Sequence, residues 1–233
     1  MTTLNLALLG FTLAFLKKFG YRILIVFFIW FVVTNYYHNQ MNIIRQFVTV
    51  FSFPLLLLLL IEKRFLYSGI TAVIALFSHQ IFVVMLAFLG IIYFIKRFFI
   101  RKYIFLIFVF SFFLYLFVLP GASYFIIDFF VPTFKKYYSG SGLSGSGLIF
   151  LATKLIYVPL FLLFFYVYYS KQRFYSYFIS RHKYFDFFIA IFAATALSFI
   201  LLLFVDRFNR IYVYFAFFSI FPLYYLYTYF LST

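Results

Sequence analysis

The clearest chemical signal in this sequence comes from five basic side chains, Arg45, Lys135, Lys136, Arg207 and Arg210. A guanidinium group donates paired hydrogen bonds to phosphate oxygens and stays charged at any physiological pH. As a set, these residues indicate a site for a polyanion. Taken singly, each arginine also has a structural explanation. Asp206 lies four residues before Arg210, which suits a helical ion pair, and Arg207 could snorkel to a membrane surface.

Acid–base chemistry could come from His79 or from the carboxylates Asp128 and Asp206. A histidine titrates near neutrality, so His79 could act as a general base or a phosphate ligand, or it could simply bond a backbone carbonyl. The two acids have no defined separation and do not indicate a glycosidase pair. His38 and His182 fall in predicted loops, where we expect them to be solvated.

Other motifs carry little chemistry. The run Gly140–Gly145 spells G-x-G-x-x-G but follows a loop instead of a strand, so we interpret it as a linker. The chain has no cysteine, which excludes disulfides and thiolate chemistry. No metal-binding motif occurs, and we expect neither a metal nor a cofactor.

The elements that must position these residues are membrane helices. With 68% hydrophobic and 10% charged residues and a mean hydropathy of +1.13, the chain has too little polar surface for a soluble protein. Continuous apolar runs favour helices over a barrel. The net charge of +15 stands mainly at the ends of these runs, so we expect no nucleic-acid partner. The predicted fold is an all-α, polytopic integral membrane bundle of about eight to nine membrane segments.

Apolar runs mark the predicted segments, at about residues 3–16, 23–37, 46–61, 65–95, 103–119, 148–169, 184–205 and 211–231. The first run lacks the cationic start of a secretory signal, so we expect it to be retained. The run 65–95 is too long for one crossing of about 30 Å at about 1.5 Å per residue. Cations flank both of its ends, which predicts a hairpin of two helices of about 14 residues that reverses near Ser78, His79 and Gln80. This reversal would place His79 in a protein-lined cavity.

The positive-inside bias orients these segments. Most lysines and arginines fall in clusters that share the predicted inner side: Lys17, Lys18, Arg22, Lys63, Arg64, Lys96, Arg97, Arg101, Lys102, Lys171, Arg173, Arg181 and Lys183. The five basic residues named first lie on the outer side, against this bias, and an outer anion site would explain them. Lys154 lies within a segment and can snorkel. We predict one membrane domain, 1–233, with an outer loop at 120–147 that combines an interfacial segment and a mobile Gly/Ser-rich stretch.

Several short motifs follow one another in a fixed order: Asn42-Ile43-Ile44-Arg45-Gln46 at the start of a segment, the basic break from Glu62 to Arg64, Phe77-Ser78-His79, Tyr137/Tyr138, and Arg210-Ile211 before Tyr214-Phe215. From about Tyr36 onward this order resembles the EpsG-like branch of Wzy-type bacterial polysaccharide (O-antigen, capsule or exopolysaccharide) polymerases. Relatives usually carry more segments before the first motif, which implies that part of the N-terminal region is missing here. Ile81 stands where relatives often have a small polar residue.

The resemblance implies a membrane glycosyltransferase of the bacterial inner membrane. Such polymerases act at its outer face on oligosaccharides linked to undecaprenyl diphosphate, and they transfer a growing chain to a new repeat unit. The expected partners are this polyprenyl-diphosphate-linked glycan, membrane lipids and a chain-length regulator.

The resemblance also implies roles for individual residues. Arg45, Arg207 and Arg210, with Lys135 and Lys136, would bind the diphosphate and stabilise its developing charge. His79 or one of the acids Asp128 and Asp206 would activate the acceptor hydroxyl. Tyr137 and Tyr138 would stack on sugars, and the Gly/Ser-rich loop would act as a lid.

Three alternatives stay open. A flippase or other transporter of lipid-linked oligosaccharides would also need cations for a diphosphate, but the chain lacks the internal repeats and midplane charges of many transporters. A membrane acyltransferase using His79 should carry further polar residues within its segments. A non-catalytic subunit or fragment would use its basic loops only to fix topology.

Overall fold

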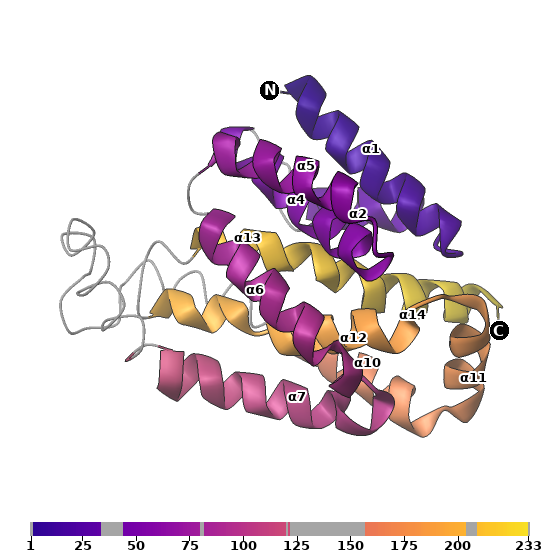
Figure 1. Ribbon diagram of the computed structural model, residues 1–233. Coiled ribbons are helices and arrows are strands. Elements are labelled where there is room, and N and C mark those ends of the chain that lie inside the picture. The colour runs from indigo at the N-terminus through magenta and orange to yellow at the C-terminus, as the bar shows by residue number, and fades with distance from the viewer. Residues whose placement is uncertain are drawn as a thin grey trace. The chain divides into compact units, whose positions relative to one another are not determined.

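A computed structural model describes residues 2–33, 44–79, 82–119, 121, 157–203 and 209–232, and the regular elements among them are all helical (Figure 1). The predicted all-α class is therefore confirmed. Most of the predicted outer loop at 120–147 lies outside these residues. The described part of the chain forms two compact units, and each is considered by itself.

The first unit contains Met1–Phe98, Phe178–Phe185 and Leu223–Thr233. Its main helices are α1 (Thr2–Lys18), α2 (Leu24–Val33), α4 (Ile44–Ile61), α5 (Phe65–Ser78) and α6 (Phe82–Ile95). Helix α4 packs against α1, α5 and α6 and lies at the centre of this unit. The buried residues of α5 are small, Ser68, Thr71 and Ala75, and their spacing of three and four residues puts them on one face. Small residues let neighbouring membrane helices approach closely, which explains the tight packing of α5.

The break within the long apolar run confirms the predicted hairpin. Helices α5 and α6 have 14 residues each, as expected, and His79 lies between them in an extended conformation. The backbone N–H of His79 donates to Ala75 O at 3.1 Å, and Phe82 N–H donates to His79 O at 3.0 Å. Figure 1 shows α5 running toward this break and α6 running back from it.

The second unit contains Phe99–Tyr177 and Asp186–Pro222. Its described helices are α7 (Arg101–Phe113) with a π-helical extension η2 (Leu114–Val118), α10 (Tyr157–Ser170), the first part of α11 (Gln172–Arg181), α12 (Phe185–Thr195), η4 (Ser198–Leu203) and α13 (Asn209–Ala216). Helix α13 continues through η6 (Phe217–Ser219) into α14 (Ile220–Ser232). Aromatic rings form much of the packing. Phe192 of α12 contacts Phe161, Phe164 and Phe165 of α10 with ring centroids 5.0 to 6.1 Å apart.

Two elements differ from the sequence prediction. The predicted inner loop around residues 171–183 contains helix α11. Phe174 and Phe178 lie four residues apart on one face of this helix, and both are fully buried. Burial of that face stabilises a helix where a loop was predicted. The predicted segment 184–205 is not one helix. Helix α12 ends at Thr195, and the chain continues as the 3₁₀ helix η4 after a turn at residues 196–197.

Two stretches of the described chain are long and apolar enough to cross a membrane, Arg101–Val118 and Tyr212–Leu231. Two consecutive stretches, Gln172–Arg181 and Phe185–Ile200, meet the same criterion only when taken together, and the chain bends by 113° between them. Several apolar helices are shorter, among them Phe47–Ile61, Phe65–Ser78 and Phe161–Ser170. These lengths support a membrane protein, and the predicted number of segments stays a prediction.

Candidate functional site

The first unit brings two predicted site residues, Arg45 and His79, to one end. Arg45 lies in the first turn of α4, and His79 follows the last residue of α5. The two helices pack against each other and are joined by the short turn at Lys63. Val48 and Ser78 are equally far from that turn along the chain, so in this helix pair the start of α4 and the end of α5 both lie away from the turn. The roles predicted for Arg45 and His79 stay predictions.

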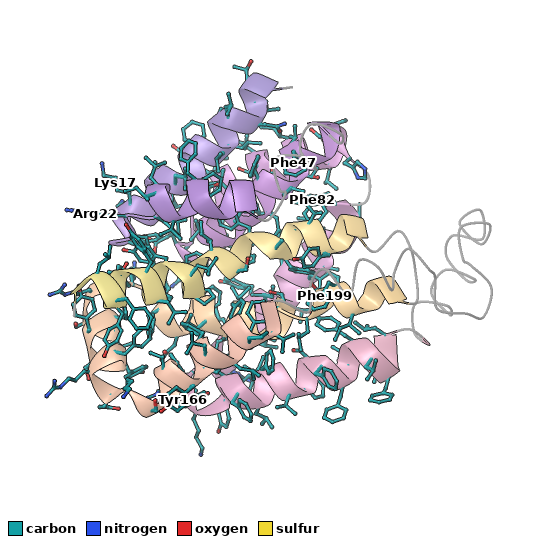
Figure 2. All side chains as sticks on the ribbon, turned by 180° about the vertical axis from the view of Figure 1, so that it is seen from behind. Lys17, Arg22, Phe47, Phe82, Tyr166 and Phe199 are labelled. Carbon is teal, nitrogen blue, oxygen red and sulfur yellow. The ribbon has the colours of Figure 1, made fainter. Side chains whose placement is uncertain are left out.

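His79 is partly exposed as a residue, while its Nδ1 atom is buried. Phe82, three residues further on, is fully buried, and so is Phe47 in the first turns of α4. Figure 2 labels these two rings at one end of the unit and labels Lys17 and Arg22 at the other end. His79 thus lies at the end of the first unit opposite to the cations that follow α1.

Those cations belong to a connected set of turns, which we name the basic end of the first unit: residues 17–23, 62–64 and 181–184. Lys183 Nζ lies 2.8 Å from Glu62 Oε1, and the hydroxyl of Tyr184 donates to the same oxygen at 2.6 Å. These hydrogen bonds, that from Lys183 first, hold the pKa of Glu62 below its ordinary value. Tyr21 OH donates to Lys183 O at 3.0 Å. Three predicted inner loops therefore meet at one end, as the topology requires.

His182 is buried in this basic end, so its predicted solvation is wrong. Its ring lies 4.6 Å from that of Tyr21 and 5.5 Å from that of Phe178, measured between centroids. Tyr225 OH donates to Tyr21 OH at 2.8 Å and closes the cluster. Burial, and secondarily the nearby Arg181, lowers the pKa of His182 to about 4. This packing could not be predicted, because Tyr21 is far from His182 along the chain, and so is Tyr225.

The second unit has a basic end of its own, built around Arg101 and defined by residues 99–102, 168–175 and 186. The guanidinium of Arg101 donates to Tyr168 O at 3.1 Å, Tyr169 O at 3.3 Å and Gln172 Oε1 at 3.2 Å. It also lies 4.0 Å from the ring centroid of Tyr175. Arg101 thus satisfies carbonyls in the last turn of α10, which have no partner within that helix.

Asp186 completes this basic end and was missed by the sequence analysis. Its two carboxylate oxygens accept hydrogen bonds from Tyr168 OH at 2.7 Å and Tyr175 OH at 3.0 Å. Its place in the first turn of α12 is the signal that could have identified it, since carboxylates favour helix N-termini. Glu62 and Asp186 thus both have structural partners.

Arg210 lies in the first turn of α13, in the second unit, while Arg45 and His79 belong to the first. Each arginine follows the first described residue of its helix, Ile44 in α4 and Asn209 in α13. The remaining predicted site residues lie outside the described residues: Asp128, Lys135, Lys136, Tyr137, Tyr138, Asp206 and Arg207. Their predicted roles stay predictions. Within the described ranges, no group of three or more metal-ligating side chains occurs.

Comparison with known proteins gives one clear result. No curated protein and no solved structure matches the chain. The model of the EpsG family matches residues 1–233. This match confirms the family that the motif order resembles. The chain is a membrane protein of polysaccharide biosynthesis and belongs to the EpsG family.

Proposed function

We propose that this protein polymerises oligosaccharide repeat units linked to undecaprenyl diphosphate at the outer face of the bacterial inner membrane. In this multi-pass topology of about eight to nine segments, the basic ends of both units face the cytoplasm. The observation that carries the proposal is the position of His79 and the first turn of α4, together at the end opposite to the basic end of the first unit. This end would then face outward, where the lipid-linked substrate is presented.

The placement of Arg45 and Arg210 supports an anionic substrate. Both residues lie on the predicted outer side, against the insertion bias. A bound diphosphate would compensate this cost, because its negative charge would pair with both guanidinium groups. Arg207, Lys135 and Lys136 would add charge to the same site.

The reaction is a glycosyl transfer. The acceptor hydroxyl oxygen attacks the anomeric carbon of the growing chain, and the bond between that carbon and the diphosphate oxygen breaks. The electron pair goes to the diphosphate, whose developing charge Arg45 and Arg210 would stabilise. The hydroxyl proton goes to His79 or to Asp128 or Asp206 acting as base. Tyr137 and Tyr138 would hold sugars in the cleft beneath the Gly/Ser-rich lid at residues 137–147.

A glycan ladder tests this function. The native bacterium would be compared with a deletion strain restored with wild type, Arg45→Ala or, as a matched control, Arg173→Ala. Arg173 is an exposed arginine of α11 and has no role in the proposed site. We expect the deletion and Arg45→Ala to leave lipid carrying one repeat unit, and wild type and Arg173→Ala to restore the ladder. An unchanged ladder on deletion contradicts the proposal, and loss of even the single-unit band points to export instead.

A further inference from the structure

The hydrogen bonds of the second unit show where the α-helical pattern of α12 ends. In a continuous α-helix, the N–H of residue 198 would donate to the carbonyl of residue 194. Instead, Ala196 N–H makes the last such bond, to Phe192 O at 2.7 Å, and Ile200 N–H donates to Leu197 O at 2.9 Å in the tighter 3₁₀ pattern. The carbonyl of Ala194 accepts a hydrogen bond from Tyr115 OH at 2.6 Å.

Tyr115 comes from a second distorted element. It lies in η2, the π-helical stretch that extends α7, and its side chain is buried. Short π-helical stretches within α-helices often mark functional positions. The π-helical turn and the break after α12 are thus joined by one hydrogen bond between Tyr115 and Ala194.

The break leaves the buried hydroxyl of Ser198 without a hydrogen-bond partner. Other buried or half-buried hydroxyls of this chain donate to the carbonyl four residues earlier, as Thr195 does to Ile191 O and Ser52 does to Val48 O. For Ser198 that carbonyl is Ala194 O, which accepts a hydrogen bond from Tyr115 OH instead. Ser198 is only 2% exposed, and its Oγ has no hydrogen-bond partner. An unpaired buried hydroxyl is destabilising, and such groups in native proteins call for an explanation.

The break has a geometric effect further along the chain. Six residues of 3₁₀ helix, as in η4, rise about 3 Å more than six residues of α-helix and turn about 120° further. Tyr115 packs in a buried cluster with Leu197, Phe199 and Ile200, and Tyr212 of α13 packs against the same cluster. The rings of Phe199, labelled in Figure 2, and Tyr212 meet edge to face at 6.1 Å. The start of α13 therefore rests on η2 and η4.

We propose that Tyr115 is a positioning residue for Arg210. By holding the carbonyl of Ala194, it keeps the helix broken after Thr195 and sets the height and rotation at which α13 begins, with Arg210 in its first turn. The effect on catalysis rests on the proposed function of Arg210, whereas the mechanical effect does not.

The mechanical effect is measurable without activity, because the chain has no natural cysteine. Asn209→Cys would place a thiol at the first residue of α13, and its rate of maleimide labelling would be measured in the purified protein. We expect Tyr115→Phe, which frees Ala194 O for Ser198, to change this rate at least threefold. Adding Ser198→Pro should restore it, because proline has no N–H to donate and clashes with the carbonyl four residues earlier. An unchanged rate, or a change that Ser198→Pro does not reverse, overturns the inference.

A second variant keeps the test valid if Tyr115→Phe does not accumulate in the membrane. Ser198→Pro alone should leave the labelling rate as in the parent, since proline is tolerated at the first residue of a helix. A changed rate would show that the helix is not broken at this position in solution and would overturn the inference.

The glycan ladder then separates this inference from the proposed function. We expect Tyr115→Phe to shorten the ladder and Tyr115→Phe with Ser198→Pro to restore it, a rescue that a general loss of stability does not predict. If the labelling changes and is rescued while the ladder stays normal, the positioning effect stands and the role of Arg210 in polymerisation fails.

Discussion

Lys183 Nζ lies 2.8 Å from Glu62 Oε1 and joins two turns that are 121 residues apart in the chain. One turn connects α4 to α5, and the other connects α11 to α12. A direct ion pair between them requires that both turns lie at the same level of the first unit. The charges that the positive-inside bias assigns to one side are thus brought together by the fold itself.

This contact predicts a mild acid sensitivity. Because the folded pKa of Glu62 is lowered from its ordinary value of 4.5, its carboxylate stabilises the fold at neutral pH, and this contribution is lost as the pH falls through the folded pKa. Glu62→Gln should reduce the free energy of unfolding at pH 7 by about 1 kcal/mol, since half of the Lys183 side chain is exposed. Thermal unfolding in detergent at pH 7 and below pH 4.5 measures both effects. If Glu62→Gln and wild type lost equal thermal stability on acidification, the ion pair between Glu62 and Lys183 would be contradicted.

His182 predicts a second pH effect, in a different range. Its pKa is lowered from 6.5 to about 4 by burial and by Arg181, so the folded state keeps the ring neutral while the unfolded state binds a proton. Stability should therefore decline as the pH falls from 6.5 toward 4. The rings of Tyr21, Tyr224 and Tyr225 contact it in tilted or edge-to-face geometry and can pack against phenylalanine in the same way. His182→Phe should thus lose less thermal stability than wild type between pH 7 and 5, and a larger loss would refute a buried neutral histidine.

Gly20 offers a test of how closely these turns approach. It has a φ of +93°, and a Cβ atom added there would lie 2.7 Å from Arg181 O. Gly20→Ala should therefore destabilise the protein by about 1–3 kcal/mol. Gly10, within α1, has nothing within 4 Å of an added Cβ, so Gly10→Ala is a matched control that should be neutral or stabilise by up to about 1 kcal/mol. Similar unfolding temperatures for the two variants would show that the turns do not meet.

The sequence was sufficient to predict features that depend on length and charge. The run between Lys63 and Lys96 is too long for one helix and has cations at both ends, and the resulting hairpin at His79 has the predicted arm lengths. The inner clusters at Lys17, Glu62 and Lys183 were likewise predictable, because the insertion bias acts on local charge.

Features that depend on partners distant in sequence were not predictable. In a chain with 44 phenylalanines and 23 tyrosines, no pattern singles out Tyr21 as the partner of His182 or Tyr115 as the partner of Ala194. No proline or glycine marks the break after α12. The interaction found at the break is the hydrogen bond from Tyr115 OH to Ala194 O, and it comes from a helix distant in sequence. For the candidate site, the helix turns that carry Arg45 and Arg210 could be predicted from the apolar runs.

The contacts of Arg101 predict that lysine cannot replace arginine at this position without a loss of stability. Its guanidinium reaches three acceptors at once, the carbonyls of Tyr168 and Tyr169 and the amide oxygen of Gln172. Lysine keeps the charge but lacks the planar fork. Arg101→Lys should therefore lower the free energy of unfolding by about 1–2 kcal/mol, whereas Lys102→Arg, at the next position, should have little effect. Equal stability of Arg101→Lys and wild type would show that only the charge matters.

The proposed topology predicts which residues a reagent can reach from outside the cell. Because the chain lacks cysteine, single thiols can be introduced without removing any natural one. Lys63→Cys and Arg173→Cys lie in the basic ends of the two units, so an impermeant maleimide should label them only after the membrane is permeabilised. Asn209→Cys, beside Arg210, should be labelled in intact spheroplasts. Lys63→Cys and Arg173→Cys should show the same labelling pattern, because the proposed topology assigns both basic ends to the inner side. If instead Lys63→Cys reacts in intact spheroplasts, the basic end of the first unit faces outward, His79 and Arg45 face the cytoplasm, and an outer diphosphate site built on them is ruled out.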